Sequence, residues 1–239
     1  MTARNIVFIS DAHVACGGPN EAEFKAMLNS LAASDYDIFF LGDIMDLWIG
    51  KKRYEDDLQR WFVDWCRRES EHRRIVYVEG NHEFFVADKY NGVIGTFLEK
   101  RFHDDVVAVE HGHNILGRTI GFNRLFIAFC KSGFSSFVLD VVPFGQKLVL
   151  WIKGMFGSNG RTLFDRLPDE ILRTWAENVS VETGCKDVFI GHFHTRQELE
   201  LSHGGSFRII PAWKHNFEVM LYEPDSRNAT IRNWREIGK

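Results

Sequence analysis

The sequence predicts an α/β fold in which two packed β-sheets are flanked by helices. Short apolar runs rich in Val, Ile and Phe recur along the chain, and amphipathic segments separate the early runs. Toward the C-terminus the runs alternate and are joined by short turn-rich stretches. A chain of 239 residues can bury one sizeable core, so we expect one domain over residues 1–239.

Six apolar runs are expected to be buried strands, because continuous β-branched and aromatic runs are typical of strands covered on both faces. Turn residues at His203 to Ser206 and at Pro224 to Ser226 predict two antiparallel hairpins. The chain should therefore begin as βαβ units and finish as a meander. The six runs are Asn5 to Ser10, Asp37 to Leu41, Arg74 to Val78, Val106 to Glu110, Asp187 to Ile190 and Phe207 to Ile210.

Three segments between the strands show helical features. Glu21 to Ala33 and Asp57 to Glu71 each place large apolar side chains on one face, so their aromatic residues are expected to pack in the core. A third helix is expected to start at Pro168, where acidic residues follow, and to end at Gly184.

Residues 122–165 do not fit this alternation of strands and helices. They are crowded with Phe, Leu and Val, yet they also carry several Lys and Arg residues. We interpret them as a helical insertion that forms a cap. Two roles stay open for it: a helical hairpin that only covers the core, or a lid or membrane-facing surface with an apolar face and basic edges.

The composition narrows the classes of protein and partner. A formal charge of -4 and a pI near 6.2 give no overall basic field, so we expect no nucleic-acid partner. The four cysteines form no CxxC pair, which disfavours a zinc ribbon or a disulfide scaffold and fits a reducing cytosol. No signal peptide and no apolar stretch of ~20 residues is evident, so we expect a cytoplasmic location.

Five segments that follow predicted strands carry Asp, Asn and His residues. Open α/β sheets bind ligands at the carboxyl ends of their strands, so we expect these segments to meet. A single Asp-x-His or Gly-Asp is common in turns, whereas five such exits in one chain are not. The segments are Asp11-Ala12-His13, Gly42-Asp43, Gly80-Asn81-His82-Glu83, His111-Gly112-His113 and Gly191-His192-Phe193-His194.

These residue types point to a pair of divalent cations. A carboxylate has two oxygens that can bridge two ions, an Asn carbonyl is a neutral ligand, and two imidazoles that flank one residue form a clamp. Such mixed oxygen and nitrogen ligation suits Mn²⁺, Fe or Zn²⁺, and we prefer Mn²⁺. Two cations roughly 3.5–4 Å apart can activate water and neutralise charge during attack on phosphorus, which predicts a dinuclear phosphoesterase.

The five segments, from Asp11 to His194, resemble the signature of the calcineurin-like metallophosphoesterase superfamily. The resemblance implies a four-layer α/β-β/α sandwich. It also implies two metal sites that share Asp43. One site would be formed by Asp11, His13, Asp43 and His194, and the other by Asp43, Asn81, His111 and His192, with His113 as the alternative to His111.

The resemblance implies three catalytic residues, which are Asp43, Asn81 and His82. His82 would stabilise the transferring phosphoryl group or protonate its leaving oxygen. Glu83, its neighbour in the chain, is the residue that we expect to orient it.

A narrower resemblance concerns the flanking residues. Gly42 to Gly50, Pro211-Ala212-Trp213 and the long insertion are similar to the UDP-2,3-diacylglucosamine pyrophosphohydrolases of lipid A biosynthesis. That family cleaves a pyrophosphate to a lipid monophosphate and UMP, and its insertion forms a cap that accepts acyl chains. It usually has Arg where this chain has His82 and Asp where this chain has His113.

Several residues are candidates for contacts with the substrate, namely Arg124, Lys131 and Arg161 with phosphate and Trp48 and Trp213 with the pocket. Solvated cations and core-packed indoles are the alternatives. A UDP-linked lipid at the cytoplasmic face of the inner membrane is the leading substrate. Two hypotheses compete with it. In one the substrate is a small soluble phosphoester, and in the other the protein is a non-enzymatic scaffold that keeps metal for structure. The full set of predicted ligands disfavours the scaffold.

Overall fold

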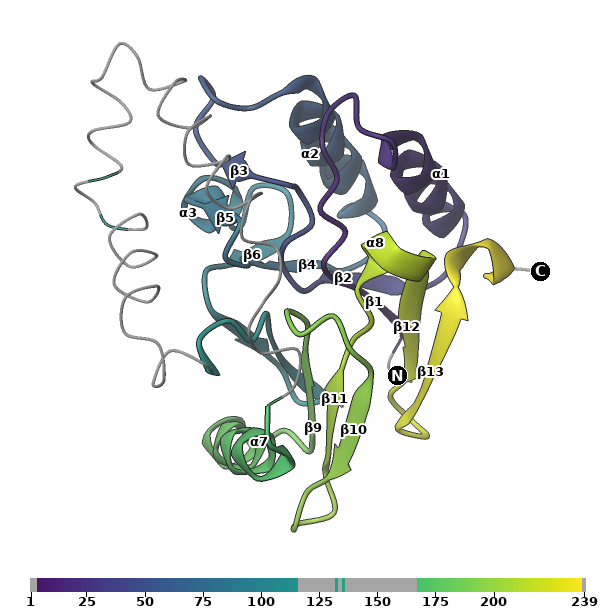
Figure 1. Cartoon of the computed structure of the whole chain (residues 1–239). Helices are drawn as coiled ribbons and strands as arrows, with labels where there is room; N and C mark the ends of the chain where they lie inside the picture. The colour runs from purple at the N-terminus through teal and green to yellow at the C-terminus, as the bar shows by residue number, and fades with distance from the viewer. Residues whose placement is uncertain (1–3, 116–131, 133–134, 136–166, 238–239) are drawn as a thin grey trace.

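The computed structural model describes residues 4–115, 132, 135 and 167–237. Apart from Ser132 and Ser135, the insertion expected over residues 122–165 lies outside them, as do Arg124, Lys131 and Arg161. Two central sheets and the helices around them form a mixed α/β structure (Figure 1).

The first sheet has six strands in the order β13-β12-β1-β2-β4-β6. The strands β1, β2, β4 and β6 are parallel to one another, and β12 and β13 run antiparallel at the other edge. Their bounds are β1 Ile6–Ile9, β2 Asp37–Phe40, β4 Ile75–Val78, β6 Thr96–Leu98, β12 Glu218–Glu223 and β13 Asn228–Asn233.

The second sheet has five strands in the order β10-β11-β9-β8-β7, and its three central strands are parallel. A separate pair, β3 with β5, is also parallel. Their bounds are β7 Arg101–His103, β8 Val107–Glu110, β9 Asp187–Ile190, β10 Gln197–Glu200, β11 Ser206–Ile209, β3 Trp48–Ile49 and β5 Glu83–Phe84.

Helices begin and end where local signals favour it. A capping box between Asp56 and Gln59 starts α2, and Gly184, with a φ of 77°, ends α7 in the left-handed region that favours glycine. None of the helices among the described residues is long and apolar enough to cross a membrane. The bounds are α1 Glu21–Ala32, α2 Asp57–Glu69, α3 Val86–Tyr90, α7 Asp169–Thr183 and α8 Trp213–Asn216, followed by the short 3₁₀ helix η2 Trp234–Glu236.

Alternation along the strands divides the apolar residues between layers. In β1, Val7 and Ile9 join the core beneath α1 and α2, whereas Ile6 and Phe8 join the core between the two sheets. There Phe8 stacks on Phe189 of the second sheet with ring centroids 4.4 Å apart. A third cluster packs α7 on the outer face of the second sheet. The expected α/β-β/α order of layers is confirmed.

The predicted strands agree with the structure within one residue at each end, but the C-terminal meander is wrong. The two hairpins form, yet β10-β11 belongs to the second sheet and β12-β13 to the first. Between them the chain crosses from one sheet to the other. This crossing segment is held by an isolated β-bridge between Ser10 and Ala212. The Trp213 N–H also donates to the Ser10 carbonyl at 3.0 Å.

Asp187, at the amino end of β9, ties the two sheets together. Its buried carboxylate accepts from Arg227 Nε at 2.7 Å and from the Tyr222 hydroxyl of the first sheet at 2.7 Å. It also accepts from the Ser206 hydroxyl of β11. Burial alone would raise the pKa of Asp187, but these hydrogen bonds bring it below its ordinary value.

We expect Asp187→Asn to lower the free energy of unfolding at pH 7 by about 1–3 kcal/mol, because several donors lose a charged acceptor. Since the folded pKa is depressed, this stabilisation is present above about pH 4 and is lost as the pH falls further. Urea unfolding at pH 7 and pH 3 should show a larger difference between variant and wild type at pH 7. Asp225→Asn, in the exposed β12–β13 turn, is the control; equal stability of Asp187→Asn and wild type at pH 7 would contradict the account.

Candidate metal centre

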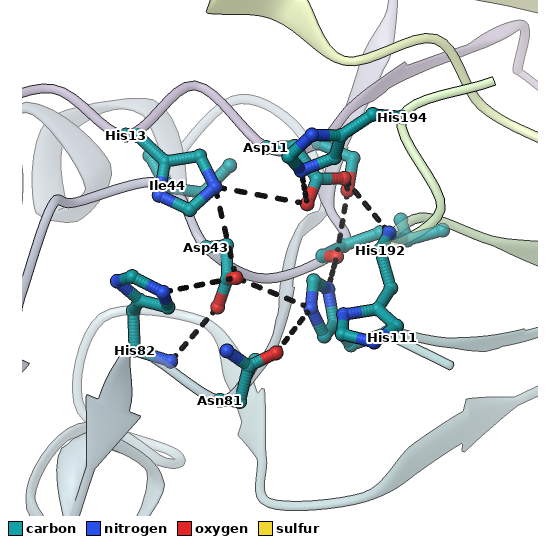
Figure 2. Close-up of polar contacts among 12 residues, drawn as sticks. Asp11, His13, Asp43, Ile44, Asn81, His82, His111, His192 and His194 are labelled. Carbon is teal, nitrogen blue, oxygen red and sulfur yellow. Dashed lines mark hydrogen bonds and ion pairs between the residues drawn. The ribbon is translucent and has the colours of Figure 1, made fainter. Parts of the chain in front are cut away.

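The seven residues predicted to bind metal surround one small volume (Figure 2). They come from the loops that follow β1, β2, β4, β8 and β9, so both sheets contribute from the carboxyl ends of their parallel strands. The residues brought together are Asp11, His13, Asp43, Asn81, His111, His192 and His194.

Five of these residues adopt a left-handed backbone. The φ angles are 51° at Asp11, 44° at His13, 52° at Asp43, 70° at His192 and 51° at His194. Each such conformation costs on the order of 1–3 kcal/mol in a residue with a side chain. Among the described residues only three other non-glycine positions share it, so the unusual conformations concentrate at this site.

The glycines of the motifs are needed because the loops approach one another closely. A Cβ atom placed at Gly80 would meet the Asp43 backbone nitrogen at 2.6 Å and would overlap the Asp43 carboxylate. One placed at Gly191 would lie 2.8 Å from Asp11 Oδ2 and would overlap the Ser10 hydroxyl. A side chain at either position would push the loops apart.

The Asp43 carboxylate lies at the middle of the group, and the residue is only 2% exposed. Its Oδ2 lies 3.5 Å from His111 Nε2, 3.7 Å from His13 Nε2 and 3.9 Å from His82 Nε2. Its Oδ1 accepts a hydrogen bond of 2.9 Å from the His82 backbone N–H. Three imidazoles therefore converge on one oxygen of a buried carboxylate.

Asp11 forms the second acidic position. Its Oδ2 accepts from the Ser10 hydroxyl at 2.6 Å and from the His192 backbone N–H at 2.9 Å. Its Oδ1 lies 3.1 Å from His194 Nε2 and 3.9 Å from His13 Nε2. One oxygen is thus held by the protein, and the other faces two imidazoles.

The orientation of His111 is set from behind. Its Nδ1 lies 2.7 Å from the Leu41 carbonyl oxygen, which can only accept, so Nδ1 donates. In the neutral ring this leaves the lone pair of Nε2 pointing inward, 3.3 Å from Asn81 Oδ1. Both atoms are potential ligands of a cation beside Asp43.

The geometry suits divalent cations. Ligand atoms of Asp11, His13 and His194 lie within 4.8 Å of one another, and so do those of Asp43, His111 and His192. A third group joins His13 to Asp46 and His82.

His13 gives independent support for a cation. Its Nε2 is buried and has no hydrogen-bond partner among the described residues. It lies between the carboxylates of Asp11 and Asp43, at 3.9 Å and 3.7 Å, too far for hydrogen bonds to either. A buried polar atom of this kind requires a partner, and a cation between the carboxylates would provide one.

The protonation states agree with this chemistry. Burial lowers the pKa of His13 to about 4 and that of His192 to about 3, so both imidazoles are neutral near pH 7. Burial would raise the pKa values of Asp11 and Asp43, but neighbouring histidines bring both below the ordinary value. For His111, burial lowers the pKa, but Asp43 outweighs it and raises the pKa to about 9. A cation that binds His111 must displace that proton.

The expected pairing of Glu83 with His82 is wrong. His82 Nδ1 lies 2.6 Å from the carbonyl oxygen of Asp46, which orients the ring. The Glu83 carboxylate is fully buried and points to the backbone instead: Oε2 accepts from the N–H groups of Asp43 at 2.8 Å and Gly80 at 2.6 Å. Oε1 accepts from the Ile44 N–H at 2.8 Å. Glu83 thus fastens the loop after β2 to the loop after β4.

The two tryptophans considered as pocket residues pack in the core. Trp48 and Trp213 are both 0% exposed in the cluster beneath α1 and α2, where Trp213 meets the Phe24 ring edge-on. Their indoles therefore have no surface to offer a substrate. The rings of His113 and His111 have centroids 5.5 Å apart, and His111 Nε2 lies 3.5 Å from Asp43 Oδ2, so His111 is the histidine of this motif that we assign to the Asp43 carboxylate.

Sequence reasoning missed three residues near the centre. Ser10 holds Asp11, and its position directly before the first motif was the signal. Lys214 and His215 follow the Pro-Ala-Trp segment in α8, and the His215 ring lies 5.6 Å from the His194 ring.

Comparisons with known proteins show what this chain is similar to. Residues 4–219 match the sequence profile of the family described as calcineurin-like phosphoesterase. The chain is similar to the UDP-2,3-diacylglucosamine hydrolase of Shewanella pealeana, with 22% identity over 235 residues that cover 92% of this chain and 94% of the relative. The protein of the same name from Pseudomonas entomophila is 24% identical, over 79% of this chain and 81% of the relative.

Among solved structures, the fold is similar to that of TT1561 from Thermus thermophilus. The two share 12% identity, with 98% of this chain and 100% of that chain covered and a TM-score of 0.51. At this identity the similarity concerns the fold alone.

We expect Glu83→Gln to lower the free energy of unfolding by about 1–3 kcal/mol, because an amide cannot accept from N–H groups at both of its ends. Tyr77→Phe removes only the hydroxyl that donates to Glu83 Oε1 at 2.8 Å, and should cost about 0.5–1.5 kcal/mol. Chemical denaturation of both variants measures the difference. A Glu83→Gln protein as stable as wild type would show that the two loops do not need this carboxylate.

Proposed function

Because the chain belongs to the calcineurin-like phosphoesterase family and is a metal-dependent phosphoester hydrolase, we propose that it cleaves phosphoester or pyrophosphate bonds at a centre of two divalent cations, preferably Mn²⁺. The observation that carries this proposal is the gathering of six other ligand side chains around the buried carboxylate of Asp43. Together with Asp43, those side chains are imidazoles, carboxylates and an amide, the donor set that such ions take.

In this proposal Asp11, His13, Asp43 and His194 would hold one cation. Asp43, Asn81, His111 and His192 would hold the other, so Asp43 belongs to both ligand sets. The buried Nε2 of His13, which has no hydrogen-bond partner within the described part of the chain, and the inward Nε2 of His111 support the assignment.

When bound, the two cations activate water as a nucleophile and neutralise charge on the phosphate oxygens. The protein supplies position and protons. Because the Asp46 carbonyl holds His82 Nδ1, His82 Nε2 faces the centre, 3.9 Å from Asp43 Oδ2. In its protonated form Nε2 would stabilise the transferring phosphoryl group or donate a proton to the leaving oxygen.

The leading substrate is UDP-2,3-diacylglucosamine, hydrolysed to a lipid monophosphate and UMP. The relatives' names and their similarity over most of both chains support this choice. In this proposal residues 122–165 form a cap that receives the acyl chains, Arg124, Lys131 and Arg161 contact phosphate, and the protein binds peripherally to the cytoplasmic face of the inner membrane. His82 and His113, where that family usually has Arg and Asp, favour the second candidate, a small non-lipid phosphoester.

The substrate class is tested by comparing detergent-presented UDP-2,3-diacylglucosamine with UDP-N-acetylglucosamine in the presence of Mn²⁺. Burial of only four methylene groups at about 0.8 kcal/mol each would favour the lipid by more than about 100-fold in kcat/KM. UMP release, followed by chromatography, is the readout. Equal rates for the two substrates would exclude a site for acyl chains, and turnover of small phosphoesters alone would favour the second candidate.

The metal assignment is tested by Asp43→Ala. Loss of the shared carboxylate should remove both cations and lower kcat/KM by at least about 100-fold, since loss of even an outer partner of a metal site costs about 10–100-fold. Elemental analysis gives the metal content, and hydrolysis of bis(p-nitrophenyl) phosphate gives the rate.

His82→Ala is the matched comparison, because His82 lies beside the same carboxylate but is assigned no cation. It should keep the wild-type metal content and lower kcat by about 10²–10⁴-fold. Full turnover in Asp43→Ala, or loss of metal in His82→Ala, would contradict the roles given to the two residues.

A further inference from the structure

Two basic side chains stand beside the metal centre without a role in it. Lys214 and His215 lie on α8, the short turn that leads from the second sheet into β12 (Figure 1). No hydrogen bond or ion pair joins the Lys214 ammonium to any residue that the structure describes. His215 is exposed, and its ring lies 5.6 Å from that of His194.

The position of α8 relative to the centre is fixed by the backbone. The Lys214 N–H donates to the Asp11 carbonyl at 3.3 Å, and the Trp213 N–H donates to the Ser10 carbonyl at 3.0 Å. The Trp213 indole is fully buried, packs against Phe24 and anchors α8 in the core. These contacts fix the backbone of Lys214 and His215 beside the loop that contains Asp11 and His13.

The charge of Lys214 acts on the centre. Lys214 is partly buried, and burial lowers its pKa, while the carboxylates of Asp11, Asp43 and Asp46 oppose that shift. In turn, the ammonium contributes to the lowered pKa of His13, after burial and His82. An ammonium group that is partly desolvated, near the predicted metal ligands and without a direct partner among the described residues is suited to bind an anionic group of a substrate.

We propose that Lys214 and His215 form a second phosphate subsite, which holds a phosphoryl group next to the one at the metal centre. The substrate class is then a diphosphate ester, with one phosphorus attacked at the centre and the other bound on the α8 side, toward His194. This proposal rests on the proposed function and narrows it, because a substrate with a single phosphate leaves the subsite unused.

The test uses UDP and UMP, which differ by one phosphoryl group, as probes of the full-length protein loaded with Mn²⁺. Titration calorimetry should show that UDP binds at least tenfold more tightly than UMP to the wild type. In Lys214→Met this preference should fall below threefold, whereas Lys214→Arg, which keeps the charge, should retain it. His215→Ala should narrow the preference at least threefold.

Lys186→Met is the matched control. Lys186 is an exposed lysine at the amino end of β9, the opposite end of that strand from the centre, so its removal should leave the preference unchanged. Thermal unfolding of each variant shows whether it is folded. If Lys214→Met is not folded, Lys214→Arg still allows the role of the Lys214 charge to be tested. A wild type without preference for UDP, or a folded Lys214→Met protein that keeps the preference, overturns the subsite.

Failure of the subsite and failure of the proposed function have different outcomes. If the wild type binds two cations and hydrolyses bis(p-nitrophenyl) phosphate but does not distinguish UDP from UMP, only the subsite is wrong. If it neither binds metal nor hydrolyses that ester, the proposed function is wrong. The ratio of UDP to UMP affinity is a binding measurement, so it tests the role of Lys214 in the subsite in either case.

Discussion

Two buried carboxylates, Asp11 and Asp43, share one small volume, and the structure around them depends on how their charge is compensated. A buried ionised group is tolerated only when it is paired and hydrogen-bonded. Here the protein provides part of that compensation through the Ser10 hydroxyl, backbone N–H groups and nearby imidazoles. The His13 Nε2, which has no hydrogen-bond partner among the described residues, indicates that divalent cations complete it.

The loops that carry the ligands approach one another closely, and this requires unusual backbone conformations. Glycines permit the close approach of the loops after β2, β4 and β9, and the ligands themselves adopt left-handed conformations. Glu83 offsets some of this cost by accepting from the N–H groups of two loops with one carboxylate. The packed sheets beneath the loops supply the rest of the rigidity, so the site is preorganised by the fold.

The strands and their exits could be predicted because apolar periodicity and strand-end chemistry are local properties of the chain. Contacts set by side-chain direction could not. Glu83 follows His82 directly, but successive residues at the start of β5 point to opposite sides, so Glu83 faces the interior instead of its neighbour. Likewise the two hairpins were predictable, whereas their division between sheets depends on the long-range contact of Ser10 with Ala212. Trp48 and Trp213 show the same limit, since composition does not distinguish a pocket wall from a core.

The central claim is that two cations lie on either side of the Asp43 carboxylate. Crystals grown with Mn²⁺ and measured at its absorption edge test it most directly. The account predicts two anomalous peaks, one near Asp11, His13 and His194 and the other near Asn81, His111 and His192, with Asp43 between them. A single peak away from Asp43, or no peak under saturating Mn²⁺, would contradict it.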